Sequence, residues 1–321
     1  MKRFCTCSIV LAVAGCGSSP GDTVDAGSVD VGTGTEPLRV RWERLGEDGP
    51  PPRPEPYLGT LNGTIVLFGG RSGINGFLDD TWIWDGSWTQ LSPPTSPPPR
   101  ANGVLVEQDG RLILVGGVGR DESDGLEVLG DVWSFDGTTW SPLPGTIPGR
   151  QGAAASLVGG HVVVVGGSDR EVARRADAWS LAPTATTWTE LPEEPRGRRD
   201  AAMTTIGADG YLTGGSVPGA SADVVRFDGS EWTTVGELRV QRAYHAAGTL
   251  ADRVVVFGGV ITSTQPIGVT DGWPHGVMVV GDEPEPRMAP RMITLGDAVY
   301  MWGGRTMVGE SSELWRLERA P

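Results

Sequence analysis

Short apolar runs recur along the chain, and each one closes on a pair of glycines. Ile65–Phe68, Leu112–Val115 and Val254–Phe257 are three such runs. A run without polar alternation indicates a strand that is buried on both faces. Each run follows a shorter strand-like segment and a tight turn, so the pattern predicts a series of β-hairpins rather than helices.

The Gly-Gly pairs recur at steps of 47, 50, 48, 44 and 45 residues, a period typical of propeller blades. An arginine lies 16 residues before the first glycine of every pair. These arginines are Arg53, Arg100, Arg150, Arg198, Arg242 and Arg287. The fixed spacing indicates six structural repeats.

A two-residue turn is expected between the first two strands of each repeat. The expected turns are Asn62-Gly63, Asp109-Gly110, Gly159-Gly160, Asp209-Gly210, Ala251-Asp252 and Gly296-Asp297. After each Gly-Gly pair, a loop of variable length leads to an acid-led aromatic strand such as Asp80–Trp84, and then to a strand with Trp-x-x-Leu such as Trp88–Leu91. The fifth repeat lacks Trp-x-x-Leu, and its Pro274 has no N–H for a central strand. The sequence therefore gives no definite prediction for the outer half of that repeat.

The ordered set of Arg, Gly-Gly and late Trp resembles the kelch repeat over about residues 38–319. The resemblance implies an all-β fold, a six-bladed β-propeller of four-stranded antiparallel blades. The sixth repeat ends near Leu317 without a fourth strand, whereas Arg41–Leu45 precedes the first repeat. We therefore expect the N-terminal strand to pair into the last blade and close the ring, which removes open sheet edges.

The first residues are interpreted as a targeting signal. Residues 1–15 begin with positive charge and continue with an apolar stretch too short to span a bilayer. The segment that ends at Cys16 resembles the bacterial lipoprotein signal, which implies cleavage before Cys16, its acylation and, with Gly17 next, export to the outer membrane. An ordinary secretory signal with an accidental cysteine is the alternative. Residues 16–37 are interpreted as a flexible acidic Gly/Ser/Asp tether, and residues 38–321 as the propeller.

Composition excludes several function classes. The net charge of −14 argues against a nucleic-acid partner, because such binding rests on neutralising phosphates with basic residues. No cofactor or metal is expected, since His161, His245 and His275 fall in different repeats. Copper oxidases on kelch propellers use a Cys–Tyr crosslink, but every cysteine lies within the first 16 residues. The motifs of common hydrolases are absent as well, so no catalytic residue is predicted.

Strand order predicts which face carries a ligand. In an up-down-up-down blade, the loop between strands two and three shares one face with the link between blades. The six arginines therefore lie beside the variable loops 71–79, 118–130, 168–176, 216–222, 260–270 and 305–312. The candidate ligand face consists of these arginines with Asp121, Asp124, Arg174 and Arg175. A structural role for the arginines, tying one blade to the next through carboxylates and carbonyls, is favoured over ligand contact.

The leading hypothesis is a lipid-anchored, non-catalytic and monomeric module that binds a protein or a glycan at the bacterial cell envelope. It rests on a rigid repeat scaffold with divergent loops and no catalytic motif. The first alternative is a sugar mutarotase or epimerase, because six-bladed kelch proteins that act on sialic acid exist. The second alternative is a purely structural envelope protein.

Overall fold

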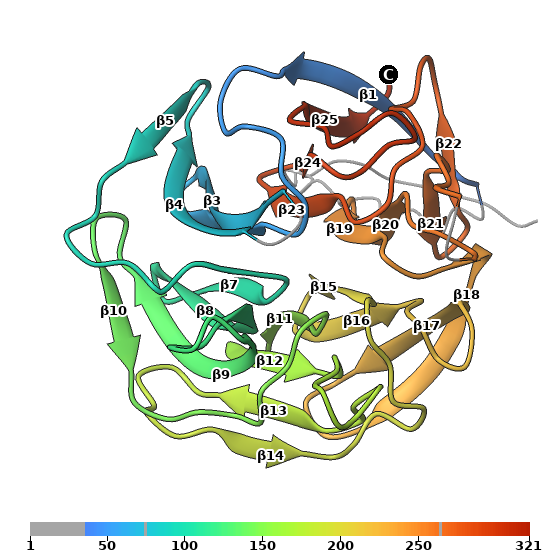
Figure 1. Cartoon of the computed structure of the whole chain (residues 1–321). Helices are drawn as coiled ribbons and strands as arrows, with labels where there is room; N and C mark the ends of the chain where they lie inside the picture. The colour runs from blue at the N-terminus through green and yellow to red at the C-terminus, as the bar shows by residue number, and fades with distance from the viewer. Residues whose placement is uncertain (1–35, 74–75, 263–264) are drawn as a thin grey trace, which may run out of the picture. The chain divides into compact units, whose positions relative to one another are not determined.

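The computed structural model describes residues 36–73, 76–262 and 265–321, which belong to one compact unit, Glu36–Pro321. They form six small sheets around an axis, a six-bladed β-propeller (Figure 1). The predicted signal peptide, Cys16 and the tether up to residue 35 lie outside the described residues. Within the described ranges, no helix is long and apolar enough to cross a bilayer.

The strands of the first three blades follow one another along the chain. Blade one holds β2 (Tyr57–Leu61), β3 (Thr64–Ser72), β4 (Gly76–Trp84) and β5 (Trp88–Leu91). Blade two holds β6 (Arg100–Ala101), β7 (Val104–Gln108), β8 (Arg111–Arg120), β9 (Leu126–Phe135) and β10 (Trp140–Leu143). Blade three holds β11 (Ala154–Val158), β12 (His161–Val165), β13 (Ala178–Leu181) and β14 (Thr189–Leu191).

The last three blades complete the ring. Blade four holds β15 (Ala202–Ile206), β16 (Asp209–Thr213), β17 (Ser221–Phe227) and β18 (Trp232–Arg242). Blade five holds β19 (Ala246–Leu250), β20 (Arg253–Phe257) and β21 (Asp271–Trp273). Blade six holds β23 (Arg291–Leu295), β24 (Ala298–Trp302), β25 (Leu314–Arg319) and β1 (Leu38–Gly46). The first strands β2, β7, β11, β15, β19 and β23 contact one another in a closed ring around the axis.

The expected closure by the N-terminal strand is confirmed. β1 pairs antiparallel with β25, with Trp42 opposite Leu317. Trp42 takes the place of the late Trp of blade six: its indole Nε1 donates to Thr270 Oγ1 of blade five at 2.9 Å, as Trp140 of blade two donates to Thr81 of blade one at 3.0 Å. The closing strand therefore makes the same Trp–Thr contact between blades that Trp140 makes between blades one and two, which follow each other in the sequence.

Blade five departs from the four-stranded pattern. Its sheet has three strands, and the next segment, β22 (Val277–Val279), pairs in parallel with β1 of blade six. Side chains bind the backbone at the outer edge of β21: Glu283 accepts from the Thr270 N–H at 3.0 Å, and Asp271 accepts from the Gly272 N–H at 2.8 Å. These two bonds occupy N–H groups at the start of β21.

Five of the six expected hairpin turns are confirmed, and one is wrong. In blade four, β15 ends at Ile206 and β16 begins at Asp209, so the turn is Gly207-Ala208 rather than Asp209-Gly210. In every blade the second strand needs five residues between the turn and the Gly-Gly pair, and Asp209-Gly210 would leave only three before Gly214. Gly207 adopts the positive φ of 62° that this turn requires.

The two faces of the propeller differ in what they carry. We call the face with the loops between strands two and three the mouth face, and the face with the tight hairpins the hairpin face. Both ends of Glu36–Pro321 lie at the hairpin face. The Glu36 carbonyl accepts from Arg253 at the β19–β20 turn at 3.0 Å, and the Ala320 N–H donates to the Arg39 carbonyl at 2.9 Å.

Candidate functional site

The six repeat-opening arginines of the predicted ligand face are buried. They are exposed by 0–2%, and each pairs with an acid that lies on the third strand of its own blade or immediately before it. The pairs are Arg53–Asp80, Arg100–Asp131, Arg150–Asp177, Arg198–Asp223, Arg242–Asp271 and Arg287–Glu313. In five blades the guanidinium also donates to the carbonyl of the first glycine of the Gly-Gly pair. These contacts favour the structural interpretation over ligand contact.

The link between blades comes from the backbone of these residues rather than from their side chains. The carbonyls of Arg150, Arg198, Arg242 and Arg287 each accept, at 2.9 Å, from the second glycine of the preceding blade. A Cβ on that blade's first glycine would collide with the same carbonyl; at Gly166 it would lie 2.3 Å from Arg198 O. The side chain therefore ties strands within one blade, and the main chain ties that blade to its neighbour.

The four candidates on the loops do not form a common site. Asp121 Oδ1 accepts from the N–H groups of Ser123 and Gly125, and the bond from Gly125 lowers the pKa of Asp121. Asp124 pairs with Arg120 at 3.2 Å. In blade three, Arg175 pairs with Asp169 and Arg174 is exposed. These contacts hold the loops of two separate blades in shape.

The structure instead brings together six residues at the mouth of the central channel, which we call the rim. Each lies two residues after a repeat-opening arginine and has a φ between 51° and 63°. The rim residues are Glu55, Asn102, Gly152, Asp200, Tyr244 and Ala289. Together with Arg291 and His245, among others, they line one small cavity. The left-handed backbone conformation is shared, whereas the side chains differ.

A chain of backbone hydrogen bonds links the rim residues of successive blades. The N–H of each donates to the carbonyl of the one before it, at 2.7–2.9 Å, from Asn102 round to Ala289. Between blades six and one, the Arg291 side chain donates from Nε to the Pro56 carbonyl at 2.8 Å and from Nη2 to Asn102 Oδ1 at 3.3 Å. The rim is therefore a rigid frame.

Asp200 is the most perturbed acid of the rim. Its side chain is 6% exposed, and burial raises its pKa to about 6, against the opposing influence of Arg199 and the Tyr244 hydroxyl. Asp200 Oδ2 has no hydrogen-bond partner within the described ranges. Gly152 leaves room for this carboxyl, because a Cβ there would lie 2.5 Å from Asp200 Oδ1. A buried carboxyl that titrates near neutral pH in a cavity is typical of functional sites.

Other titratable groups surround Asp200. Burial raises the pKa of Tyr244 to about 12, and the Asp200 charge adds to this. Burial lowers the pKa of Arg291, although the charges of Glu55, Tyr57 and Asp200 oppose it. Glu55 pairs with Arg71 at 2.6 Å. The mouth therefore presents carboxylates, a phenol and a guanidinium within one small space.

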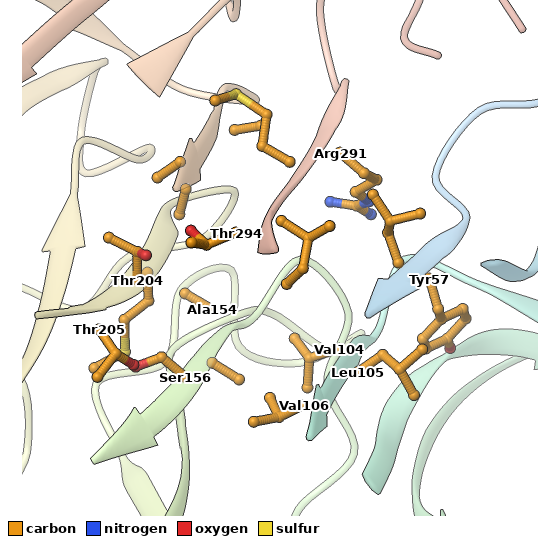
Figure 2. A pocket seen from close by; sticks show the side chains of 18 of the residues that line it. Tyr57, Val104, Leu105, Val106, Ala154, Ser156, Thr204, Thr205, Arg291 and Thr294 are labelled. Atoms are coloured by element: carbon orange, nitrogen blue, oxygen red, sulfur yellow. The ribbon is translucent and has the colours of Figure 1, made fainter. Parts of the chain in front are cut away.

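Below the rim, the channel opens into a cavity of about 420 Å³ lined by the first strands of all six blades. Figure 2 shows Arg291 and Tyr57 on one side of it and Thr204 and Thr205 on the other. Ser156 Oγ and His245 Nδ1 in its wall have no hydrogen-bond partner within the described part of the chain. Burial and the charge of Arg242 hold the pKa of His245 well below its usual range, so the imidazole is neutral.

Toward the hairpin face, threonines tie the first strands together. Thr205 Oγ1 donates to the Leu157 carbonyl at 2.7 Å, Thr249 Oγ1 to the Thr205 carbonyl at 2.7 Å, and Thr294 Oγ1 to the Thr249 carbonyl at 3.2 Å. Because these hydroxyls already bind a neighbouring blade, the polar groups with unused bonding capacity lie nearer the mouth. Across the described ranges, no group of three or more acidic, His or Cys side chains is placed to hold a metal ion.

Comparison with known proteins places these repeats in context. No family model matches the chain. An F-box/kelch-repeat protein of Arabidopsis thaliana is 31% identical over 156 residues, which cover 41% of this chain and 32% of that protein. The chain is a six-bladed β-propeller whose repeats are similar to those of this kelch-repeat protein.

Two further proteins are similar to this chain. N-acetylneuraminate epimerase 1 of Escherichia coli is 30% identical over 130 residues, which cover 38% of this chain and 34% of that protein. The chain thus spans about a third of the length of both curated relatives. The solved structure of YjhT superposes with a TM-score of 0.72 at 18% identity, over 84% of this chain and 96% of that one. At this identity the superposition shows the fold.

The rim of this propeller was not predicted from the sequence. The arginines attract attention because they recur, whereas the positions two residues later hold six different residue types. A signal was nevertheless present, because Asn, Asp and Gly, which tolerate left-handed conformations, occupy three of the six positions.

Proposed function

We propose that this kelch propeller binds a carbohydrate at its channel mouth and acts as a glycan-binding module at the bacterial cell envelope. The observation that carries the proposal is the channel mouth, where the small cavity inside the rim and the cavity of about 420 Å³ below it share Arg291 and His245 in their walls. This region combines Asp200, Tyr244 and Arg291 with Ser156 Oγ and His245 Nδ1, two buried polar atoms that have no hydrogen-bond partner among the described residues. A ligand with several hydroxyl groups would supply the missing partners, and buried polar groups are rarely left unpaired.

The test is a binding measurement on the purified protein with a panel of sugars: N-acetylneuraminate, glucuronate, N-acetylglucosamine and galactose. Saturation-transfer NMR and calorimetry are expected to show saturable binding of at least one sugar. Arg291→Met is expected to weaken it tenfold or more, because one lost hydrogen bond to a charged group is worth about 1.5–3 kcal/mol. Arg39→Met, on the exposed outer strand β1, is the matched control.

A second pair of variants tests whether the rim or the loops of the mouth face bind the sugar. Replacing the loop tips 121–125 and 170–174 with Gly-Ser is expected to leave sugar binding unchanged. Absence of saturable binding by the wild-type protein up to about 10 mM sugar, which corresponds to less than about 3 kcal/mol, would refute the proposal. Loss of binding in the loop variants alone would move the binding surface back to the loops.

Sugar mutarotation or epimerisation is the second candidate function. The observation that favours it is the raised pKa of Asp200, about 6, because a carboxyl with that pKa can give and take a proton near neutral pH. The partial similarity to N-acetylneuraminate epimerase 1 adds support. Ring opening of a sugar requires removal of a proton from the anomeric hydroxyl and protonation of the ring oxygen, and Asp200 with Tyr244 would serve these steps.

This candidate is tested by mixing the protein with anomerically pure sugars of the same panel and following anomer exchange by NMR. Exchange faster than in buffer that is lost in Asp200→Asn would support catalysis. Asp109→Asn, at a hairpin turn on the opposite face, is the control. Anomer exchange at the buffer rate with every sugar would exclude the catalytic function and leave sugar binding as the proposed function.

Asp200 also yields a prediction about stability. Because burial raises its pKa from 3.8 to about 6, the folded protein keeps a proton that the unfolded chain has released. Stability therefore falls as the pH rises from about 4 to about 6 and then stays level. The difference between the folded and unfolded pKa of Asp200 corresponds to a loss of up to about 3 kcal/mol in the free energy of unfolding. Asp200→Asn is expected to stabilise the protein by about 1–3 kcal/mol at about pH 7.5 and little at about pH 4.

Urea unfolding of the wild type and Asp200→Asn at both pH values measures this effect, with Asp109→Asn as the control. The prediction is wrong if the gap between wild type and Asp200→Asn is the same at both pH values.

We also propose that the protein reaches the envelope through a lipid on Cys16, as the sequence resemblance implies. Expression in a bacterial host with labelled palmitate is expected to label the wild type and leave Cys16→Ser unlabelled. Equal labelling of the two proteins would refute the anchor, and Cys5→Ser controls for loss of a cysteine.

A further inference from the structure

We infer that the rim residues, rather than the loops of the mouth face, determine which sugar the site accepts. This inference rests on the proposed carbohydrate site and names the positions that give it specificity. Four observations carry it: the variation among repeats, the strained backbone, the rigid frame and the chemistry of the side chains.

The six repeats are six versions of one unit within a single molecule, so positions that the fold requires can be recognised by their constancy. The repeat-opening arginine and both glycines of the Gly-Gly pair are identical in all six blades. The rim position lies only two residues after that arginine, keeps the same backbone conformation in every blade, and holds Glu, Asn, Gly, Asp, Tyr and Ala. The fold therefore requires the backbone here and leaves the side chain open.

Backbone strain gives a second reason. Tyr244, Glu55 and Ala289 have φ values of 56°, 58° and 51°, a region that L-residues other than Asn and Asp rarely occupy. Glycine would adopt this conformation without steric cost, yet only blade three uses it. Strained residues of this kind persist where the surroundings hold them in place, and they cluster at functional sites.

The rim also presents its side chains from a rigid frame. The chain of N–H to carbonyl bonds from Glu55 to Ala289 holds neighbouring rim residues at fixed spacing. Groups whose positions are fixed before binding lose little conformational entropy when the ligand arrives. The loop residues Asp121 and Arg175 instead bond to groups within their own loops, Asp121 to the Gly125 N–H and Arg175 to Asp169.

The chemistry of the rim matches a polyhydroxylated ligand. Glu55 and Asp200 offer hydrogen-bond acceptors, Asn102 and Tyr244 offer both donors and acceptors, and Arg291 offers donors beside them. Gly152 leaves room among these polar groups for the Asp200 carboxyl. A site built to bind a hydroxyl discriminates strongly against a sugar that lacks it or points it elsewhere, because the buried polar group is then left unpaired.

The experiment replaces rim residues with glycine, which keeps the left-handed backbone and removes the side chain. Asn102→Gly and Asp200→Gly are the rim variants. The chain offers matched controls of the same residue types at hairpin-face turns with similar backbone conformation, Asn62 (φ 50°) and Asp109 (φ 52°). Affinities for N-acetylneuraminate, glucuronate, N-acetylglucosamine and galactose are measured for all four variants, and thermal unfolding checks that each is folded.

The rim variants are expected to change the ratio of affinities between two sugars by tenfold or more, whereas Asn62→Gly and Asp109→Gly stay within about twofold of the wild type. All four are expected to remain folded, and Asn102→Gly, Asn62→Gly and Asp109→Gly to retain the wild-type Tm within about 3 °C. Wild-type binding with unchanged ratios in both rim variants overturns the inference and leaves the carbohydrate site standing. Equal changes in rim and control variants also overturn it. A wild-type protein that binds none of the four sugars overturns the proposed function, and this inference with it.

Discussion

Replacing Trp42 with alanine is expected to lower the free energy of unfolding of the whole propeller by about 3–5 kcal/mol, out of a total of about 5–15 kcal/mol for a typical domain. Trp42 is 8% exposed and packs edge-on against Phe257 with ring centroids 5.3 Å apart. Its indole also donates to Thr270 of blade five. The substitution therefore opens a cavity and leaves Thr270 unpaired at the junction where the ring closes.

Urea denaturation followed by tryptophan fluorescence and circular dichroism measures this loss. Arg41→Ala is the matched control, since Arg41 immediately precedes Trp42 in β1, its side chain is half-exposed, and its ion pair with Glu318 is a surface pair worth about 0–1 kcal/mol. If Trp42→Ala and Arg41→Ala lower the unfolding free energy equally, the N-terminal strand does not hold the ring closed.

Removing one repeat-opening arginine is expected to have an effect of similar size. The Arg100 guanidinium is fully buried, binds both oxygens of Asp131 at 2.6 and 2.9 Å, and donates from Nε to the Pro98 carbonyl at 2.9 Å. Arg100→Ala leaves that carboxylate and carbonyl without their partner. Breaking a buried pair costs about 3–5 kcal/mol, and because Asp131 is 38% exposed we expect about 3 kcal/mol. Arg39→Ala, at an exposed position, is the control.

The pH dependence of this loss distinguishes a broken ion pair from a simple cavity. Burial alone would raise the pKa of Asp131, but hydrogen bonds and charge from Arg100 outweigh it and lower the pKa below 3.8. The stabilisation by Asp131 is therefore present above about pH 4 and is lost as the pH falls through the folded pKa. The gap in Tm between wild type and Arg100→Ala is expected to shrink on acidification, and a constant gap would contradict the ion-pair account.

Much of the fold could be predicted because the residues that build a blade recur with it. Arg53 and its five counterparts, the Gly-Gly pairs and the tight turns each perform one backbone task six times, so their spacing alone predicts the blades. Even the misplaced turn in blade four follows this rule, since Gly207 lies seven residues before Gly214 as Asn62 lies seven before Gly69.

The rim could not be predicted in the same way. What its members share is a φ angle and a hydrogen bond to the neighbouring blade, neither of which leaves a constant residue type. The perturbation of Asp200 depends on burial by other blades and on the space left by Gly152, which lies 48 positions earlier in the chain. Blade five posed a similar problem, because the pairing of β22 with β1 joins segments more than 230 residues apart.

The placement of Glu36 and Ala320 at the hairpin face decides how the protein can be displayed. A fusion partner, a surface-coupling tag or a sensor chip linked directly to either end of Glu36–Pro321 attaches on the side away from Asp200 and Arg291. Immobilised in this way, the propeller exposes its channel mouth to the solution, and both ends of Glu36–Pro321 can be coupled without covering it.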